Sequence, residues 1–165
     1  MLQPLRRDTW APIGRVPVRY AWDRHDRISA VCALTIAPWA DRFGLYYNLQ
    51  SGNFHTPDVV GFVRHIHQHL RRPIVLIWDR WSVHRSTVTQ LQGLGCEWLD
   101  VSWLPAYAPE LDPVEFVWNH AKYVDLVNWI PEDINDLRKR LIQVFEQYRH
   151  DPIRLASFFH TAHLL

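Results

Sequence analysis

The stretch WLPAYAPELDPVE at residues 103–115 contains three prolines, at positions 105, 109 and 113. The residues before it, 98–104, are predominantly apolar and predict a strand. The residues after it, 113–123, have the apolar spacing of a helix. Because each proline fixes its own φ angle, we expect an inflexible connection between the two elements. Such a connection holds Glu115, in the first turn of the helix, in a definite position.

Glu115 also has a purely structural interpretation. Asp112 followed three residues later by Glu115 fits a capping box, in which Asp112 is the N-cap and the Glu115 carboxylate accepts the N-cap backbone N–H. The pattern alone leaves this interpretation open beside a functional one.

The rest of the chain predicts an α/β fold, a mixed sheet flanked by helices. Residues 28–37 and 43–50 indicate adjacent antiparallel strands. Thr56, Pro57 and Asp58 are typical of a helix start, with Thr56 as N-cap. The continuous apolar run 74–78 favours a strand covered on both faces. Further helices are expected at the following ranges: 86–94, 113–123, 131–149 and 152–163.

Asp79 directly follows the most apolar predicted strand. In open α/β sheets, ligands collect outside the carboxyl ends of strands, so a carboxylate there can reach a metal ion. The alternative is that Asp79 caps the next turn. If Asp79 and Glu115 meet, their oxygens suit a divalent hard cation, and a pair of such ions can act on a phosphodiester. A site of that kind usually needs a third carboxylate.

Composition indicates one packed domain inside the cell. The chain has 165 residues, 48% of them apolar, and nine tryptophans. Two cysteines, Cys32 and Cys96, form no disulfide framework, which favours a reducing, cytoplasmic compartment. No apolar run is long enough for a membrane helix.

Charge is nearly balanced over the chain, with a formal net charge of +1. Residues 1–27 nevertheless hold six arginines against three aspartates. Arginine suits phosphate groups, so Arg6, Arg7 and Arg15 are candidate DNA contacts. A genome that prefers arginine codons is the alternative explanation.

Three motifs together carry a family resemblance. They are IWDRWSVHRS at 77–86, WLPAYAPELDPVEFVWNHAK at 103–122 and RRDTWAPIG at 6–14. The chain resembles the mariner-type DDE transposases of bacterial insertion sequences, and the resemblance covers nearly all of it. The 35 residues between Asp79 and Glu115 are also close to the spacing typical of that family.

The resemblance implies an RNase H-like fold and a two-metal Mg²⁺ site, with Mn²⁺ as a substitute. It implies Asp79 and Glu115 as catalytic metal ligands, and His84 and Lys122 in supporting roles. The implied partners are DNA, both terminal inverted repeats and target, and other transposase subunits. The implied reaction is cleavage of a phosphodiester followed by attack of the freed 3′-hydroxyl on target DNA.

The family's first catalytic aspartate has no match among these residues. In the family it lies on the first strand, immediately before the point where this chain begins. We therefore expect residues 1–165 to be a truncated catalytic domain that lacks its first strand and the preceding helix-turn-helix domain, with an incomplete metal site and no activity on its own. The alternative is a non-catalytic remnant that binds DNA or intact transposase.

A zinc hydrolase is the rival enzyme class, because His65, His67 and His69 fall in one predicted helix. His65 and His69 share a helix face, but no glutamate follows His65 as in zinc proteases. A solvated helix face near its C-terminus is the favoured explanation of the three histidines.

Overall fold

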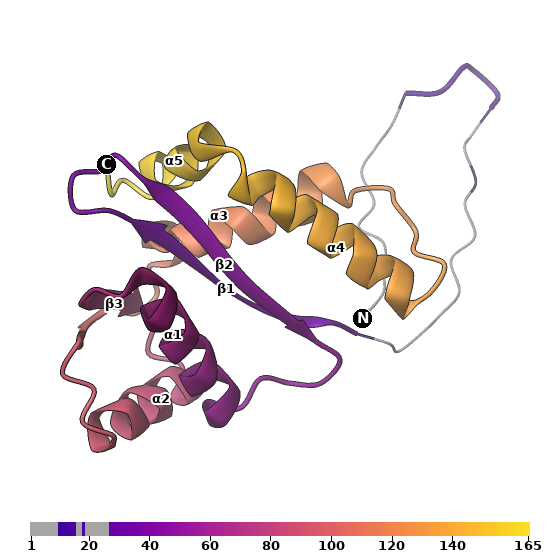
Figure 1. Ribbon diagram of the computed structural model, residues 1–165. Helices are drawn as coiled ribbons and strands as arrows, with labels where there is room; N and C mark the ends of the chain where they lie inside the picture. Colours follow the sequence, from indigo (N-terminus) through magenta and orange to yellow (C-terminus); the bar gives the residue numbers. More distant parts are fainter. Residues whose placement is uncertain (1–9, 16–17, 19–26) are drawn as a thin grey trace.

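The chain folds around a β-hairpin in the computed structural model, which describes residues 10–15, 18 and 27–165 (Figure 1). Strand β1 (Ser29–Ile36) pairs antiparallel with β2 (Phe43–Gln50), with Ser29 opposite Gln50 and Ile36 opposite Phe43. Both predicted strands and their pairing are thereby confirmed.

The two faces of the hairpin contact different parts of the molecule. Side chains at alternate positions, Leu45 and Leu49 on β2 and Cys32 on β1, pack into a core shared with the C-terminal helices. Val31, on the opposite face of β1, packs instead against the residues of a second core. The hairpin therefore lies between two lobes.

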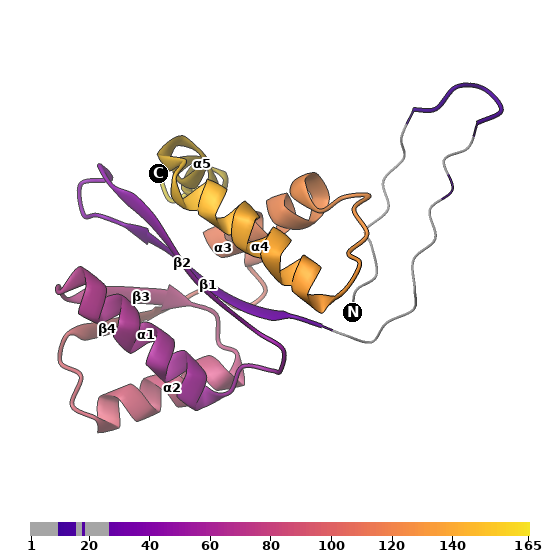
Figure 2. The same cartoon turned by 45° about the vertical axis from the view of Figure 1, so that its right-hand side comes forward.

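The first lobe is a βα unit with a parallel pair of strands (Figure 2). Helix α1 (Thr56–Leu70) leads into β3 (Ile74–Trp78), helix α2 (Ser82–Gly93) and β4 (Leu99–Trp103). β3 pairs parallel with β4, and α1 and α2 cover one face of that pair through apolar side chains. The buried members of this core are Phe54, Val59, Val60, Val63, Trp78, Val88 and Leu91.

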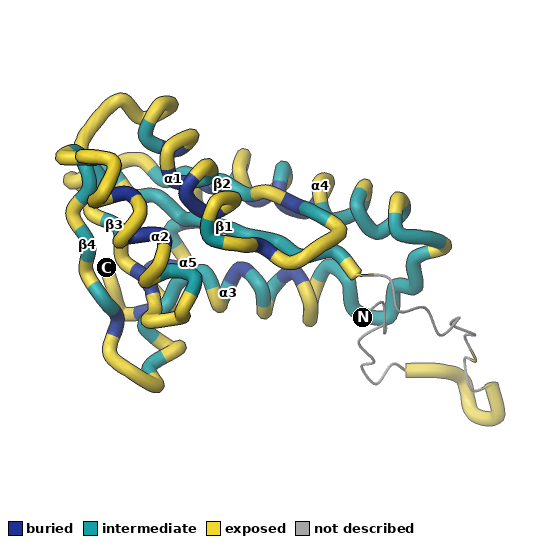
Figure 3. Tube along the Cα trace, turned by 90° about the horizontal axis from the view of Figure 1, so that it is seen from below, coloured by how far each residue is buried: buried dark blue, intermediate teal, exposed yellow. Residues whose placement is uncertain are grey.

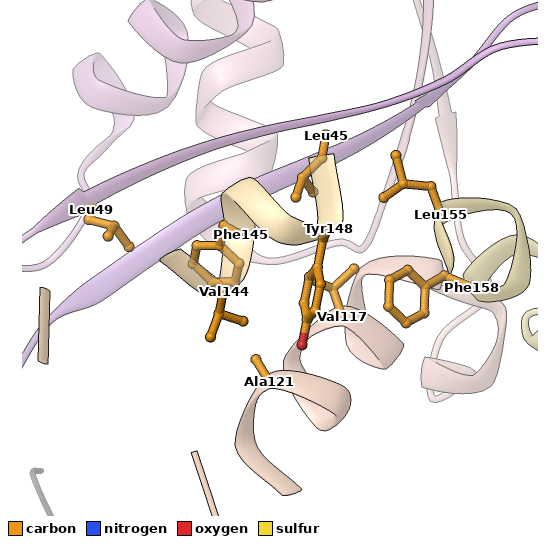
Figure 4. Packing of buried hydrophobic residues seen from close by; sticks show 9 residues of the cluster. All are labelled: Leu45, Leu49, Val117, Ala121, Val144, Phe145, Tyr148, Leu155 and Phe158. Carbon is orange, nitrogen blue, oxygen red and sulfur yellow. The ribbon is translucent and has the colours of Figure 1, made fainter. Parts of the chain in front are cut away.

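The second lobe contains the helices after the proline-rich segment. A short 3₁₀ helix, η1 (Pro109–Leu111), precedes α3 (Pro113–His120), which continues as a π-helical segment, η2 (Ala121–Asp125). Helices α4 (Ile134–Arg149) and α5 (Pro152–Thr161) complete the lobe. Figure 4 shows Val144, Phe145 and Tyr148 of α4 meeting the side chains of β2, α3 and α5.

Two arginines of α4 reach the backbone at the outer edge of β2. Arg149 Nε donates to the Leu45 carbonyl at 3.1 Å, and Arg138 Nη1 donates to the Leu49 carbonyl at 3.1 Å. Two carbonyls on this edge of the hairpin are therefore satisfied by arginines of the second lobe.

The expected single mixed sheet is not formed by the described residues. β1 pairs with β2, β3 pairs with β4, and no ladder joins β1 to β3. The expectation that β3 is covered on both faces is also wrong, because Val75 is 66% exposed and Ile77 53% exposed. In Figure 3 the buried residues, in dark blue, form short stretches that alternate with intermediate and exposed residues along the chain.

The predicted helices exist; α3 and α5 begin at the expected residues 113 and 152, whereas the other starts are shifted. α1 has His55 as its N-cap rather than Thr56, because the Asp58 carboxylate accepts the His55 backbone N–H at 2.9 Å. α2 begins at Ser82, four residues before the expected start. In the described part of the chain, no helix is both long and apolar enough to cross a membrane.

Candidate active site

Asp79 lies one residue beyond the carboxyl end of β3, with its side chain 60% exposed. Its Oδ1 accepts the Trp81 backbone N–H at 3.0 Å and lies 2.6 Å from His84 Nδ1. Asp79 therefore does stabilise the turn into α2, as the alternative interpretation held. The hydrogen bonds that the structure gives it engage one carboxylate oxygen, so the other is available for a ligand.

His84 is held beside Asp79 by two tryptophans. Its ring stacks on Trp78, with centroids 4.3 Å apart and an angle of 16° between the planes. Trp81 meets the same ring edge-on, with centroids 5.3 Å apart. The imidazole is mostly buried, and its position fixes the orientation of the Asp79 carboxylate. His84 is thus adjacent to Asp79, where a supporting residue is expected.

Glu115 projects from the first turn of α3 and is exposed. Asp112 is the N-cap of that helix, as expected, and its Oδ1 accepts the Val114 backbone N–H at 3.0 Å. The capping box does not form, because the Asp112 backbone N–H donates to the Pro109 carbonyl at 3.1 Å. Within the described residues, the Glu115 carboxylate therefore has no capping role.

The negative charges of both candidate acids raise the pKa of Asp112. Burial raises the pKa of the Asp112 carboxyl, the Val114 N–H lowers it, and the negative charges of Glu115 and Asp79 raise it further. The charges of Asp79, at the end of β3, and Glu115, on α3, therefore both raise the pKa of Asp112, after the larger effect of burial. Sequence reasoning identified Asp112 only as a helix cap and missed its place among the acids.

The predicted basic contacts are less closely connected to the acids. Lys122, in η2, is exposed, and so is Arg15. In the part of the chain that the structure describes, neither makes a contact with Asp79 or Glu115. Arg6 and Arg7 lie outside the described residues.

The described residues supply oxygen donors for a cation without completing a site. Carboxylates are the ligands that hard divalent cations prefer, so Asp79 and Glu115 suit such an ion in kind. No group of three or more His, Cys, Asp or Glu side chains among the described residues is arranged to hold a metal ion. A further ligand is needed.

The histidines of α1 have other contacts. His67 stacks on Trp98, with centroids 3.8 Å apart and planes 5° apart, and His69 Nδ1 lies 2.8 Å from the Tyr46 hydroxyl. His65 is exposed on the same helix. These contacts give two of the three a structural role between neighbouring elements.

The chain is similar to a known protein family and to solved structures. The family model described as DDE superfamily endonuclease matches residues 1–138. Two solved structures are similar at 15% sequence identity: the Mos1 Strand Transfer Complex, with a TM-score of 0.61, and the Mos1 transposase paired-end complex with left transposon end, with a TM-score of 0.57. No curated protein matches.

The two alignments include almost all of this chain, 97% and 96%. They include 46% and 51% of the Mos1 chains, so the chain spans about half the length of the solved proteins that it matches. At this identity the likeness establishes a shared fold.

Proposed function

The chain belongs to the DDE superfamily endonucleases, and on that premise we propose that it is the catalytic part of a transposase. It would cut DNA phosphodiester bonds and join the freed strand to target DNA. One observation carries the proposal: Asp79, directly after the carboxyl end of β3, and Glu115, in the first turn of α3, are exposed acids on two separate elements. In the proposal, one ligand engages both.

Asp79 and Glu115 would hold the divalent ions, Mg²⁺ or in its place Mn²⁺. Their exposed carboxylates match the oxygen preference of these cations. When bound, a pair of such ions stabilises the attacking and the leaving oxygens of a phosphodiester.

The neighbouring residues would orient this site. His84 and the Trp81 backbone N–H engage one oxygen of Asp79, which directs the second oxygen outward. Neighbours that fix a ligand in this way commonly change metal affinity when they are removed. Lys122, exposed about two turns after Glu115, would contact a DNA phosphate, as would Arg6, Arg7 and Arg15.

The site would need a third acid from outside the described residues. Asp79 and Glu115 are two carboxylates, and no cluster of three metal-binding side chains exists in the described part of the chain. We place the missing acid on a strand between β1 and β3, which no ladder joins. On this proposal, the metal site of the described residues is incomplete, and the chain would bind metal weakly and have little or no activity unless a third carboxylate joins Asp79 and Glu115.

The proposed partners are DNA, meaning the terminal inverted repeats and the target, and further transposase subunits. Support comes from the similar structures, which are a Mos1 strand transfer complex and a Mos1 paired-end complex with the left transposon end.

Manganese binding tests the two acids without requiring activity. Isothermal titration of the purified chain with Mn²⁺ is compared with Asp79→Asn, Glu115→Gln and a control, Glu110→Gln, which removes an exposed acid from the same segment. We expect each site variant to weaken binding by about tenfold or more, and the control to leave it unchanged. Equal losses in all three variants would instead indicate nonspecific attraction of the cation and would refute the proposal.

A further inference from the structure

The C-terminal half of α1 and the segment after it carry positive charge without any acid. Between Asp58 and Asp79 the chain has three arginines and three histidines, and no aspartate or glutamate. Cations near the C-terminus of a helix interact favourably with the helix dipole, which accounts for Arg71 and Arg72. Arg64 lies six residues before the last residue of α1, more than one turn away, so the dipole does not account for it.

Arg64 lines a cavity between α1 and the turn that joins α2 to β4. The cavity has a volume of about 310 Å³. Arg64, His67 and Gln68 line it from α1, and Leu94 and Trp98 line it from the other side. Residues three and four positions apart share one face of a helix, so the three α1 side chains are presented together. The volume lies at the lower end of the range for small-ligand sites.

One wall of this cavity consists of two stacked aromatic rings. The ring of His67 lies on that of Trp98, with centroids 3.8 Å apart and planes 5° apart. Trp98 also packs against the core of the first lobe, and both side chains are partly exposed. The stacked pair is therefore anchored on the protein side and accessible on the other. Such a wall suits a further flat aromatic group.

The polar side chains of the cavity are available to a ligand. In the part of the chain that the structure describes, the side chains of Arg64 and Gln68 make no hydrogen bond or ion pair. The Leu94 backbone N–H already donates to the Gln90 carbonyl. Glu97, exposed in the same turn, is not among the residues that line the cavity. Arg64 can therefore donate to an anion, while the Gln68 amide can both donate and accept.

The cavity is separate from the candidate active site. It lies at the amino ends of β3 and β4, because α1 ends just before β3 and the turn before β4 supplies its other side. Asp79 follows the carboxyl end of β3. At 3.3 Å per residue, the five steps from Ile74 to Asp79 span about 16 Å. A ligand in this cavity therefore does not occupy the metal site.

We propose that this cavity binds one nucleotide of an unpaired nucleic-acid strand. Arg64 would bind the phosphate, the base would stack on the wall of His67 and Trp98, and Gln68 would hydrogen-bond the base edge. The ring faces of bases inside a duplex are covered by their neighbours, so an aromatic wall selects an unpaired base. Cationic and aromatic side chains are combined in the same way in grooves that bind single strands. That the strand is DNA rests on the proposed function, whereas the chemistry of base and phosphate does not.

Fluorescence anisotropy in EDTA measures the binding of fluorescein-labelled single-stranded octathymidylate to the full chain. The matched ligand is an octamer with the same sugar-phosphate backbone and no bases. We expect the base-free octamer to bind about 5- to 150-fold more weakly, because it cannot stack. Equal affinities would overturn the proposal, because phosphate alone would then be recognised. Thymidine monophosphate that binds as tightly as the octamer would assign the cavity to free nucleotides and overturn the strand.

Variants at exposed positions of the cavity test the phosphate contact. Arg64→Gln should lower the slope of log affinity against log salt by about 0.7. Lys139→Gln, which removes an exposed charge from α4 in the other lobe, should leave the slope unchanged. Leu94→Glu should weaken binding more than Leu94→Gln, since the two side chains have nearly the same shape and only glutamate repels phosphate. A slope for Arg64→Gln equal to that of the parent chain would overturn the proposal.

Photocrosslinking locates the base. An octamer with a single 5-bromodeoxyuridine is irradiated on the chain, and the adduct is mapped by mass spectrometry. We expect the adduct on His67 or Trp98. Adducts confined to other aromatic residues, such as Trp81 beside Asp79, would overturn the proposal.

These assays contain EDTA and measure no cleavage, so their outcome is independent of the metal site. Loss of the expected Mn²⁺ binding would refute the proposed function and leave the nucleotide site standing. Adducts away from the cavity, together with Mn²⁺ binding that depends on Asp79 and Glu115, would refute the nucleotide site alone.

Discussion

Replacing Asp112 distinguishes its two roles, as a helix cap and as a half-buried acid whose pKa other acids raise. Asp112→Asn keeps an oxygen that can accept the Val114 N–H and removes the negative charge. Asp112→Ala removes both. We expect the asparagine variant to be more stable than the parent chain at neutral pH, since burial and the charges of Glu115 and Asp79 disfavour the ionised carboxyl.

The sign of the pH dependence follows from the raised pKa of Asp112. The folded chain holds this proton more tightly than the unfolded chain, whose carboxyl has its ordinary pKa of 3.8. Stability therefore falls as the pH rises from the ordinary pKa through the raised one. The advantage of Asp112→Asn should be complete at neutral pH and should vanish as the pH falls below the ordinary pKa.

The capping bond sets the size of the difference between the two variants. Loss of an N-cap acceptor costs about 1 kcal/mol, so Asp112→Ala should be less stable than Asp112→Asn by that amount. For a chain of this size the difference is about 2–4 °C in melting temperature. Thermal unfolding followed by circular dichroism across this pH range measures both effects.

One result would refute the reasoning. If Asp112→Asn is less stable than the parent chain at neutral pH, the Asp112 charge is stabilising, and the acids do not gather around it. The convergence of Asp79 and Glu115 would then lose its main support.

Three further variants test neighbouring features. Tyr148→Phe removes the hydroxyl of a fully buried side chain that contacts Asp125 and His120. It should lower the free energy of unfolding, measured in urea, by about 1–3 kcal/mol. An unchanged urea midpoint would show that the hydroxyl is dispensable. His84→Phe keeps the aromatic contact with Trp78 and loses the nitrogen beside Asp79. It should weaken Mn²⁺ binding by about tenfold with little change in stability, and a purely structural His84 would give the reverse. Lys122→Gln should lower the slope of log affinity for duplex DNA against log salt by about 1; an unaltered slope would remove Lys122 from the DNA contacts.

Local patterns predicted the elements well where apolar periodicity and turn residues agree. The β1–β2 hairpin and β3 follow from short apolar runs bounded by breaks, and their observed bounds fall within or match the expected ranges. The proline-rich segment predicted both the start of α3 and the N-cap Asp112. These features depend on neighbouring residues, so the sequence contains them directly.

Pairing between distant strands was harder to predict. The continuous apolar run of β3 indicates burial on both faces, yet Val75 and Ile77 are exposed, because a strand acquires its second face only from elements that pack there. The early start of α2 also depends on a side chain outside the helix: Asp79 accepts the Trp81 N–H and orders the turn before Ser82.

The candidate site was predictable as residue types and spacing, and less so as an arrangement. Asp79 and Glu115 could be selected from their positions after a strand and at a helix start. The effect of both acids on the pKa of Asp112 could not be predicted, because the capping motif by itself accounts for an aspartate at this position. Its proximity to Glu115, three residues away in the same rigid segment, was the available signal.

Iron-directed cleavage of the polypeptide tests most directly whether Asp79 and Glu115 share one metal site. Fe²⁺ is bound in place of Mg²⁺, and ascorbate with peroxide generates hydroxyl radicals that cut backbone near the ion. The account predicts cuts close to both Asp79 and Glu115, with both suppressed by added Mg²⁺ and by Asp79→Asn. Cuts beside one acid only, or cuts elsewhere that Mg²⁺ does not suppress, would contradict it.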